Sequence, residues 1–270
     1  MRNTIKSMKT FKAILLTLGV ILSTCCMLPS CQKSNKQKIV KSLEALKSQL
    51  PIDYGYGIKA TNVSYDENND LIVCEFTSDE SLLNIKSLKN QPGLLKKAWM
   101  MTISSNLNSK AGKSFQELVE IGVGVQIKFL GTKTKDNLSL ILSSEEIKKA
   151  FETPPSDEEL LDIQVQVSRL LCPQQVDEMT SMNDMCIDEH NLIYIYTIPG
   201  DISAISDDLK DELKKDIKEE LISNSYSDPI ASRFINLVRK CNKNLVYSYR
   251  GTEGGKIDVV IPATELSEGL

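Results

Sequence analysis

The stretch Phe115-Gln116-Glu117-Leu118-Val119 is similar to Phe234-Ile235-Asn236-Leu237-Val238. This similarity indicates an internal repeat that covers most of the chain. Each copy runs into a strand of alternating apolar residues that closes on a Gly-Thr pair, Gly131-Thr132 in the first copy and Gly251-Thr252 in the second. The spacing between the copies, about 120 residues, is too long for a solenoid repeat. Each copy is therefore expected to be a small domain.

The similarity extends to both sides of this stretch. A second alternating strand follows each Gly-Thr turn and ends in a Glu plus aliphatic pair, Glu146-Ile147 or Glu265-Leu266. Upstream, the helices expected at 36–50 and 156–171 end at equivalent Leu-Pro and Cys-Pro pairs. Asp/Asn-rich turns then join two alternating strands, which predicts a hairpin in each copy.

Each copy thus reads as helix, two strands, helix, two strands. In the second copy, the central helix places Leu209, Leu213, Ile217 and Leu221 on one face; in the first, Pro92 is expected to begin the longer helix of this region. We predict an α+β fold of two tandem homologous domains, residues 39–152 and 156–270. Each is expected to be a four-stranded antiparallel sheet with helices on one face.

The first thirty residues have the organisation of a bacterial signal peptide. Basic residues precede an apolar run, Phe11 to Leu22, that is too short to remain as a membrane-spanning helix. The run leads to Leu28-Pro29-Ser30-Cys31, which resembles a lipobox. Residues 1–30 are therefore predicted to be removed, and Cys31 to carry the lipid. Cys25 and Cys26 compete for this role, and secretion without a lipid is the alternative.

A lipid on Cys31 would attach the protein to a membrane of the cell envelope. Acylation by two or three chains holds a protein firmly, whereas one chain gives only marginal binding. The polar residues 31–38 are expected to form a short flexible tether.

The second copy carries motifs that resemble those of uncharacterised Bacteroidetes lipoproteins. These motifs are a Cys-Pro near the repeat start, Cys172-Pro173, and two Tyr-x-Tyr strands, Tyr194-Ile195-Tyr196 and Tyr247-Ser248-Tyr249. The first copy lacks the tyrosines. Many such lipoproteins carry acidic residues after the lipidated cysteine as a signal for export to the surface. That signal is missing here, so the resemblance implies a periplasm-facing protein and no known activity.

The charge of the chain argues against a nucleic-acid partner. The sequence contains 32 basic and 36 acidic residues, and four of the basic residues lie in the signal peptide, so the mature balance is −8. A nucleic-acid-binding protein needs a basic stripe to displace counterions, and none is evident. The partners expected instead are the membrane, through the lipid, and an envelope protein.

The mature chain contains Cys74, Cys172, Cys186 and Cys241 besides Cys31. Disulfides are compatible with an oxidising periplasm. Cys172 and Cys241 are a possible pair, because both fall at predicted helix ends in the same copy. The alternative is that all four are buried free thiols, which behave as small apolar side chains.

The sequence contains no recognisable catalytic constellation. The only histidine, His190, lies in a turn with Asp188 and Glu189, where it is expected to be solvated. No nucleophile elbow, P-loop, dinucleotide motif or Cys-x-x-Cys occurs, and we expect no cofactor and no metal. We therefore expect a non-catalytic binding or scaffolding module. A carboxylate-based enzyme acting on envelope glycans is the alternative, because distant carboxylates can converge in space.

The alternation of the strands predicts which side chains face the helices. In the second copy Tyr194, Tyr196, Tyr247 and Tyr249 are expected in the core, under the helix layer. The opposite face would then carry a set of apolar residues, namely Ile193, Ile195, Val246 and Val260. Such a surface is usually buried against something. We expect it to pack against the first copy or to bind a protein partner.

Overall fold

The computed structural model describes residues 35–54, 57–80, 85–227 and 229–267. Over these ranges the chain forms two compact units, divided between Ser156 and Asp157. None of the helices in these ranges combines the length and the hydropathy that a membrane span requires.

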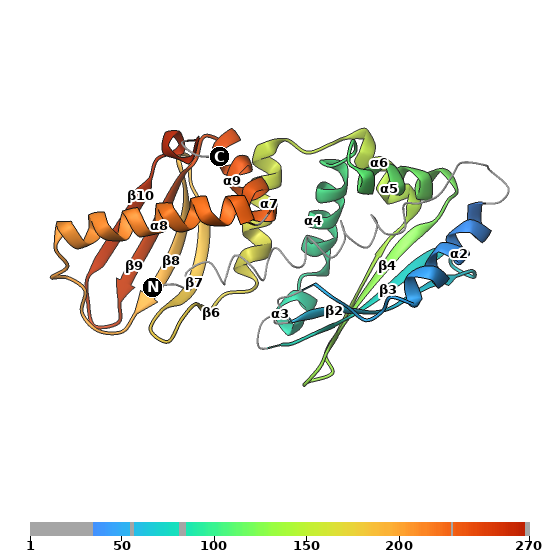
Figure 1. Ribbon diagram of the computed structural model, residues 1–270, viewed down its shortest axis with the longest axis horizontal. Coiled ribbons are helices and arrows are strands. Elements are labelled where there is room, and N and C mark those ends of the chain that lie inside the picture. The colour runs from blue at the N-terminus through green and yellow to red at the C-terminus, as the bar shows by residue number, and fades with distance from the viewer. Residues whose placement is uncertain (1–34, 55–56, 81–84, 228, 268–270) are drawn as a thin grey trace. The chain divides into compact units, whose positions relative to one another are not determined.

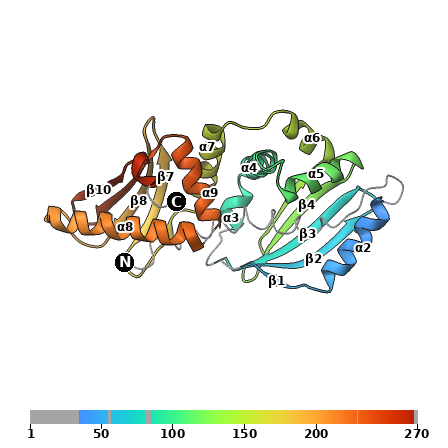
Figure 2. The ribbon, with the colours of Figure 1, turned by 45° about the horizontal axis from the view of Figure 1, so that its top comes forward.

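The first unit is a five-stranded sheet with helices packed on it (Figures 1 and 2). Its elements are α2 (Asn35–Lys47), β1 (Ile52–Asp53), β2 (Ile58–Asp66), β3 (Leu71–Ser78), α3 (Ile85–Lys89), α4 (Pro92–Ser104), α5 (Lys110–Glu120), β4 (Gly124–Gly131), β5 (Asn137–Leu142) and α6 (Ser144–Glu152). The strand order is β1-β2-β3-β4-β5. Helix α2 lies along β2, and α4 contacts both α6 and β5.

The second unit repeats this arrangement. Its elements are α7 (Asp157–Arg169), β6 (Gln174–Gln175), β7 (Ser181–Ile187), β8 (Asn191–Ile198), α8 (Asp207–Ser227), α9 (Pro229–Lys240), β9 (Asn244–Gly251), β10 (Lys256–Ile261) and the 3-10 helix η1 (Ala263–Ser267). The strand order is β6-β7-β8-β9-β10. In Figure 1, α8 crosses in front of the strands of this sheet.

The α+β class and the helix and strand positions agree with the sequence prediction, but the predicted four-stranded antiparallel sheets are wrong in two respects. Each sheet has a fifth, two-residue strand, β1 or β6. The central pair is parallel in both sheets, β3 with β4 and β8 with β9. The reason for the parallel pair is the helical connection between its strands, α3 to α5 or α8 to α9. A crossover of this length returns the chain to the starting end of the sheet.

The two sheets also agree in detail. Each has a register shift at the same place in its second strand, between Ala60 and Asn62 in the first sheet and between Met182 and Asp184 in the second. The next strand pair stays in register along its whole length in both sheets. Positions of one sheet can therefore be matched with positions of the other, strand by strand.

Helix α2 includes part of the segment that was predicted to be a tether. Residues 31–38 were expected to be flexible, but helix α2 already begins at Asn35. Ile39, Leu43 and Leu46, spaced to share one helix face, are buried against the sheet and stabilise the helix. In the first unit the longer central helix, α4, begins at Pro92 as predicted, with the proline in its first turn.

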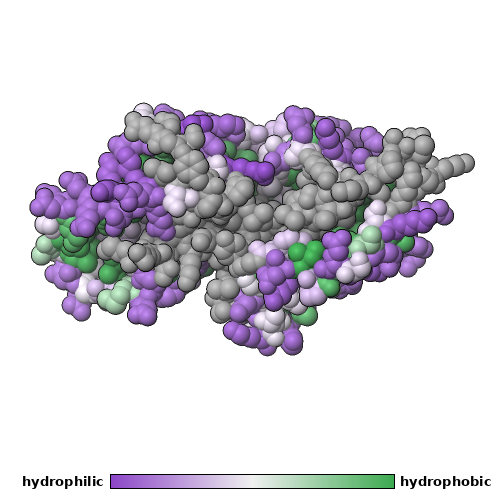
Figure 3. Space-filling model, in the orientation of Figure 1, coloured by the Kyte–Doolittle hydropathy of each residue, from purple (hydrophilic) through white to green (hydrophobic). Residues whose placement is uncertain are grey.

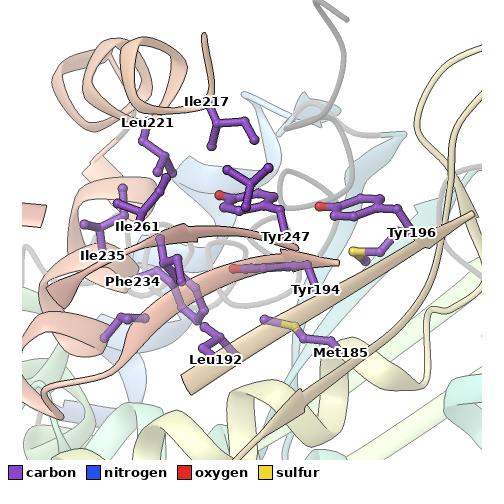
Figure 4. Close-up of a cluster of buried hydrophobic side chains, with 14 of the residues drawn as sticks. Met185, Leu192, Tyr194, Tyr196, Ile217, Leu221, Phe234, Ile235, Tyr247 and Ile261 are labelled. Atoms are coloured by element: carbon purple, nitrogen blue, oxygen red, sulfur yellow. The ribbon is translucent and has the colours of Figure 1, made fainter. Parts of the chain in front are cut away.

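The core of the second unit lies between the sheet and its helices. Leu161 and Val165 of α7, Ile217 and Leu221 of α8, and several residues of α9 cluster with the inward side chains of the strands. Figure 4 shows Tyr194, Tyr196 and Tyr247 within this cluster, with their rings nearly parallel and their hydroxyls at the same end. The tyrosines are thus core residues, as the alternation predicted.

Close packing explains the Gly-Thr pair that ends β4 and β9. A Cβ added to Gly131 would lie 2.0 Å from an oxygen of the Glu80 side chain. At Gly251 it would lie 2.1 Å from the carbonyl oxygen of Gly254 and 2.5 Å from that of Gly200. Real Cβ atoms do not approach other atoms so closely. Only glycine fits at position 251, where the neighbours are backbone atoms, whereas a side chain at position 131 would displace the Glu80 carboxylate.

Candidate functional site

The expected lipid attachment site lies outside the described residues. Cys31, its competitors Cys25 and Cys26, and the signal peptide all precede Asn35, the first residue described. The lipidation of Cys31 therefore stays a prediction.

The predicted disulfide is not formed in the structure. Cys172 and Cys241 are both free thiols, as are Cys74 and Cys186. The Cys172 thiol donates instead to the carbonyl oxygen of Ser168, at 3.7 Å, and Cys241 packs in the core of the second unit. Burial raises the pKa of each of these two thiols to about 11. Both thiols are therefore protonated near neutral pH, whereas a reactive cysteine is a thiolate at that pH.

The four residues proposed as an interaction surface lie on the face of the second sheet opposite the tyrosines. Ile193 pairs with Val246, and Val246 pairs with Val260, so these three form one line across the sheet. Cys186 pairs with Ile193 and extends the line to β7. We call Cys186, Ile193, Val246 and Val260 the apolar row. Ile195 lies two residues further along β8 on the same face, in a neighbouring row with Asp184, Ser248 and Asp258.

Sequence reasoning missed Cys186 as a member of the apolar row. The register shift between Met182 and Asp184 changes the alternation of β7, so the simple period of two does not show which face Cys186 occupies.

The matched face of the first sheet is more polar. There Glu75 stands where the second sheet has Ile195, and Gln126 stands in place of Val246. The Glu75 carboxylate accepts hydrogen bonds from Asn62, at 3.0 Å, and from Lys128, at 3.4 Å. Gln126 donates to Ser139 at 2.9 Å. These side chains form a cross-strand network suited to contact with water. The second sheet has the aliphatic residues Ile195 and Val246 in place of Glu75 and Gln126 and keeps polar residues at the other positions of the network.

Two ion pairs lie beside the apolar row. Arg169 donates to both carboxylate oxygens of Asp184, at 2.9 and 3.3 Å. Lys256 lies 2.7 Å from Asp258. Val260, on the edge strand, is 40% exposed, whereas Val246, which has a strand on either side, is 8% exposed. An apolar centre with a polar border is the general design of a protein-binding surface. On the helix side of this sheet, the surface over α8 is largely hydrophilic, with an apolar patch beside it at the left of Figure 3.

His190 lies in a turn that a neighbouring carboxylate holds closed. The Asp188 carboxylate accepts hydrogen bonds from the backbone amides of His190, at 2.8 Å, and of Asn191, at 2.7 Å. These contacts close the turn between β7 and β8 as an Asx turn does. In the part of the chain that the structure describes, His, Cys, Asp and Glu side chains form no group of three or more that could hold a metal ion.

Glu80 is a structural carboxylate that sequence reasoning missed. It follows β3 and accepts hydrogen bonds from the amide groups of Lys133 and Thr134 in the turn between β4 and β5. Partial desolvation raises the pKa of this carboxyl, but the hydrogen bonds outweigh it and lower the pKa to about 2. No sequence signal could have found this contact, because more than fifty residues separate its partners.

We expect Glu80 to contribute to the stability of the first unit in a pH-dependent way. Because its pKa is lower in the folded than in the unfolded chain, its contribution is complete above about pH 4.5 and is lost as the pH falls through about 2. Glu80→Gln should therefore destabilise the first unit at neutral pH, and the difference from the wild type should shrink on acidification. Urea unfolding followed by the fluorescence of Trp99, the only tryptophan, measures this. Equal differences at every pH would contradict the assignment.

Comparison with known proteins adds little to this description. No protein-family model matches the chain, and no curated protein sequence matches it. One similar crystal structure is that of a candidate secreted protein from Pseudomonas aeruginosa, with 12% identity, a TM-score of 0.33, and coverage of 44% of this chain and 99% of that chain. Another is the pilotin of the Vibrio vulnificus type 2 secretion system, with 12% identity, a TM-score of 0.28, and coverage of 50% and 94%. These likenesses are too weak to carry an argument. What the fold defines is a class, an α+β protein with two mixed five-stranded sheets of the same topology.

Proposed function

We propose that this protein is a lipid-anchored, non-catalytic module of the cell envelope that binds a protein partner through the apolar row of its second unit. The anchor is the lipid on Cys31, and the module faces the periplasm. The proposed anchor is supported by the basic residues, the short apolar run and the lipobox-like Leu28-Pro29-Ser30-Cys31. The proposal also includes a common origin of the two units by duplication, which their shared strand order and register support.

The observation that carries the binding proposal is the contrast between matched faces. At two equivalent positions of sheets with one topology, the first carries Glu75 and Gln126, which are hydrogen-bonded to neighbouring polar side chains, and the second carries Ile195 and Val246. Two ion pairs lie beside the apolar row, Arg169 with Asp184 and Lys256 with Asp258, so these four charges are already neutralised and the row itself offers aliphatic contact. The matching partner is a protein with an uncharged aliphatic surface, because complementary interfaces exclude unpaired buried charge.

A matched pair of variants tests this binding surface. Val260→Glu places a charge on the exposed end of the apolar row, and Ile141→Glu places it at the equivalent position of the first sheet, where the side chain is 46% exposed. A photo-crosslinking amino acid at position 258 reports contacts in intact envelopes. We expect one discrete protein adduct, which Val260→Glu abolishes and Ile141→Glu leaves unchanged, with no change in melting temperature for either variant.

Two results would overturn this proposal. One is an adduct that survives Val260→Glu, or no adduct at all. The other is a clear loss of thermal stability with Val260→Glu but not with Ile141→Glu, which would mean that the apolar row is buried within the folded chain and does not receive a partner.

A further inference from the structure

Helix α2 begins very close to the proposed lipid attachment site. Asn35 is the first residue of α2, and only residues 32–34 separate it from Cys31. A fully extended chain advances about 3.5 Å per residue, so the start of α2 lies no more than about 14 Å from the Cα atom of Cys31. The headgroup layer of a bilayer is itself about 5–7 Å thick on each side. If Cys31 carries the lipid, the first turns of α2 must lie at or near the headgroups.

The charge of α2 suits a negatively charged surface. The helix contains four lysines and one glutamate, a net charge of +3. Its counterpart in the second unit, α7, contains four acidic residues and one arginine, a net charge of −3. The two helices hold the same place in the fold, but only α2 follows the proposed lipid attachment site.

The first turn of α2 is also unusual on electrostatic grounds. The N-terminal end of a helix carries a partial positive charge, so acidic residues stabilise it and lysines do not. The first turn of α7 has Asp157, Glu158 and Glu159, in agreement with this rule. The first turn of α2 has no acidic residue and contains Lys36 and Lys38. Helix stability therefore does not account for lysines in this turn.

The lysines on the outer side of α2 are accessible. Ile39, Leu43 and Leu46 occupy the buried side of the helix. Lys41 is exposed on the other side and forms no ion pair with the described part of the chain. Lys36 pairs with Asp70, and Lys47 lies 2.7 Å from Glu44, but their side chains remain 49% and 39% exposed.

The net charges of the two units differ in the same direction as those of α2 and α7. Residues 35–156 contain 16 basic and 14 acidic residues, a net charge of +2, whereas residues 157–270 contain 11 basic and 22 acidic residues, a net charge of −11. An anionic membrane surface attracts the first set of charges and repels the second within a Debye length of about 8 Å.

From the position and charge of α2, we propose that its exposed face binds the headgroups of anionic phospholipids in the membrane that holds the lipid anchor. This inference rests on the proposed lipidation of Cys31. It assigns α2 a role as a second membrane contact beside the acyl chains.

The reactivity of individual lysines tests this proposal with the full acylated chain. The protein is reconstituted into vesicles of phosphatidylcholine alone or of phosphatidylcholine mixed with phosphatidylglycerol, and the rate of lysine acetylation is measured by mass spectrometry. A lysine near an anionic lipid surface gains about 1 kcal/mol, a factor of about five in population. Lys41 should therefore react about fivefold more slowly on the anionic vesicles, and added salt should restore its rate. Lys215 of α8, whose side chain is 75% exposed, is the internal control and should react equally on both.

The same mass spectra distinguish a failure of the proposed lipid anchor from a failure of the proposed contact between α2 and lipid. An N-terminal peptide without acyl chains overturns the anchor and, with it, the lipid contact of α2. An acylated peptide with equal Lys41 rates on the two kinds of vesicle overturns the contact alone. Slower reaction of both Lys41 and Lys215 on anionic vesicles also overturns it, because the charge of the lipid would then act on the whole protein.

Discussion

Replacing Tyr247 by alanine is expected to lower the free energy of unfolding of the second unit by about 3–5 kcal/mol, the usual effect of removing a buried aromatic side chain. Tyr247 is 3% exposed and lies at the centre of the core of this unit. Its ring stacks on Tyr194 at a centroid distance of 5.2 Å and on Tyr196 at 6.2 Å. Alanine would remove both contacts and leave a cavity.

Tyr247→Phe is the matched variant and should not destabilise the second unit. Among the described residues, the Tyr247 hydroxyl has no hydrogen-bond partner although it is buried. Burial of such a group costs about 1–3 kcal/mol. Burial also raises the pKa of the Tyr247 hydroxyl well above its usual value, so it is neutral in the folded protein. Phenylalanine keeps the ring and removes the unsatisfied oxygen, so the stability should stay equal or rise.

Calorimetry and circular dichroism measure the effect of both variants on unfolding. Trp99 of the first unit is 1% exposed, and its fluorescence reports that unit in the same samples. Destabilisation by Tyr247→Phe comparable to that by Tyr247→Ala would show that the hydroxyl makes an important hydrogen bond, and the packing argument would then be wrong.

Cys31→Ala is expected to release the protein from the membrane fraction almost completely. If Cys31 is the modified residue, its loss removes the acyl chains, and a few lysines alone bind a membrane too weakly to survive washing. Cell fractionation measures the release, and mass spectrometry of the mature N-terminus identifies the modified residue. Cys25→Ala and Cys26→Ala are the controls and should leave the protein membrane-bound. Release by either control, or a mature N-terminus without lipid, would contradict the choice of Cys31.

Much of the secondary structure could be predicted because it depends on short-range patterns. The alternation of apolar residues located β3, β4, β8 and β9, and Pro92 located the start of α4. The same alternation, compared between the copies, identified the four tyrosines as core residues, and they are 2–5% exposed. Alternation fixes which face a side chain occupies, because successive residues of a strand point to opposite faces.

Strand direction and sheet size could not be predicted in the same way. The parallel pairs β3 with β4 and β8 with β9 depend on where a long helical connection returns the chain. The two-residue strands β1 and β6 are too short to have any periodic pattern. The sequence left open whether Cys172 and Cys241 are bonded or free, and both are free thiols in the structure. A position at a helix end does not fix the distance between two thiols.

The sequence alone determined the internal similarity of the two halves, the lipoprotein-like N-terminus and the contrast between the faces of the two sheets, since each of these is a comparison of residue types along the chain. Only the tertiary structure decided that Ile193, Val246 and Val260 form one row with Cys186, because register is a relation between separate strands. The structure also decided that α2 begins at Asn35, because buried contacts of Ile39, Leu43 and Leu46 extend the helix into residues that look polar and flexible in sequence. Tertiary packing contributes most of the stability of a short helix, so its boundary lies beyond the reach of local sequence patterns.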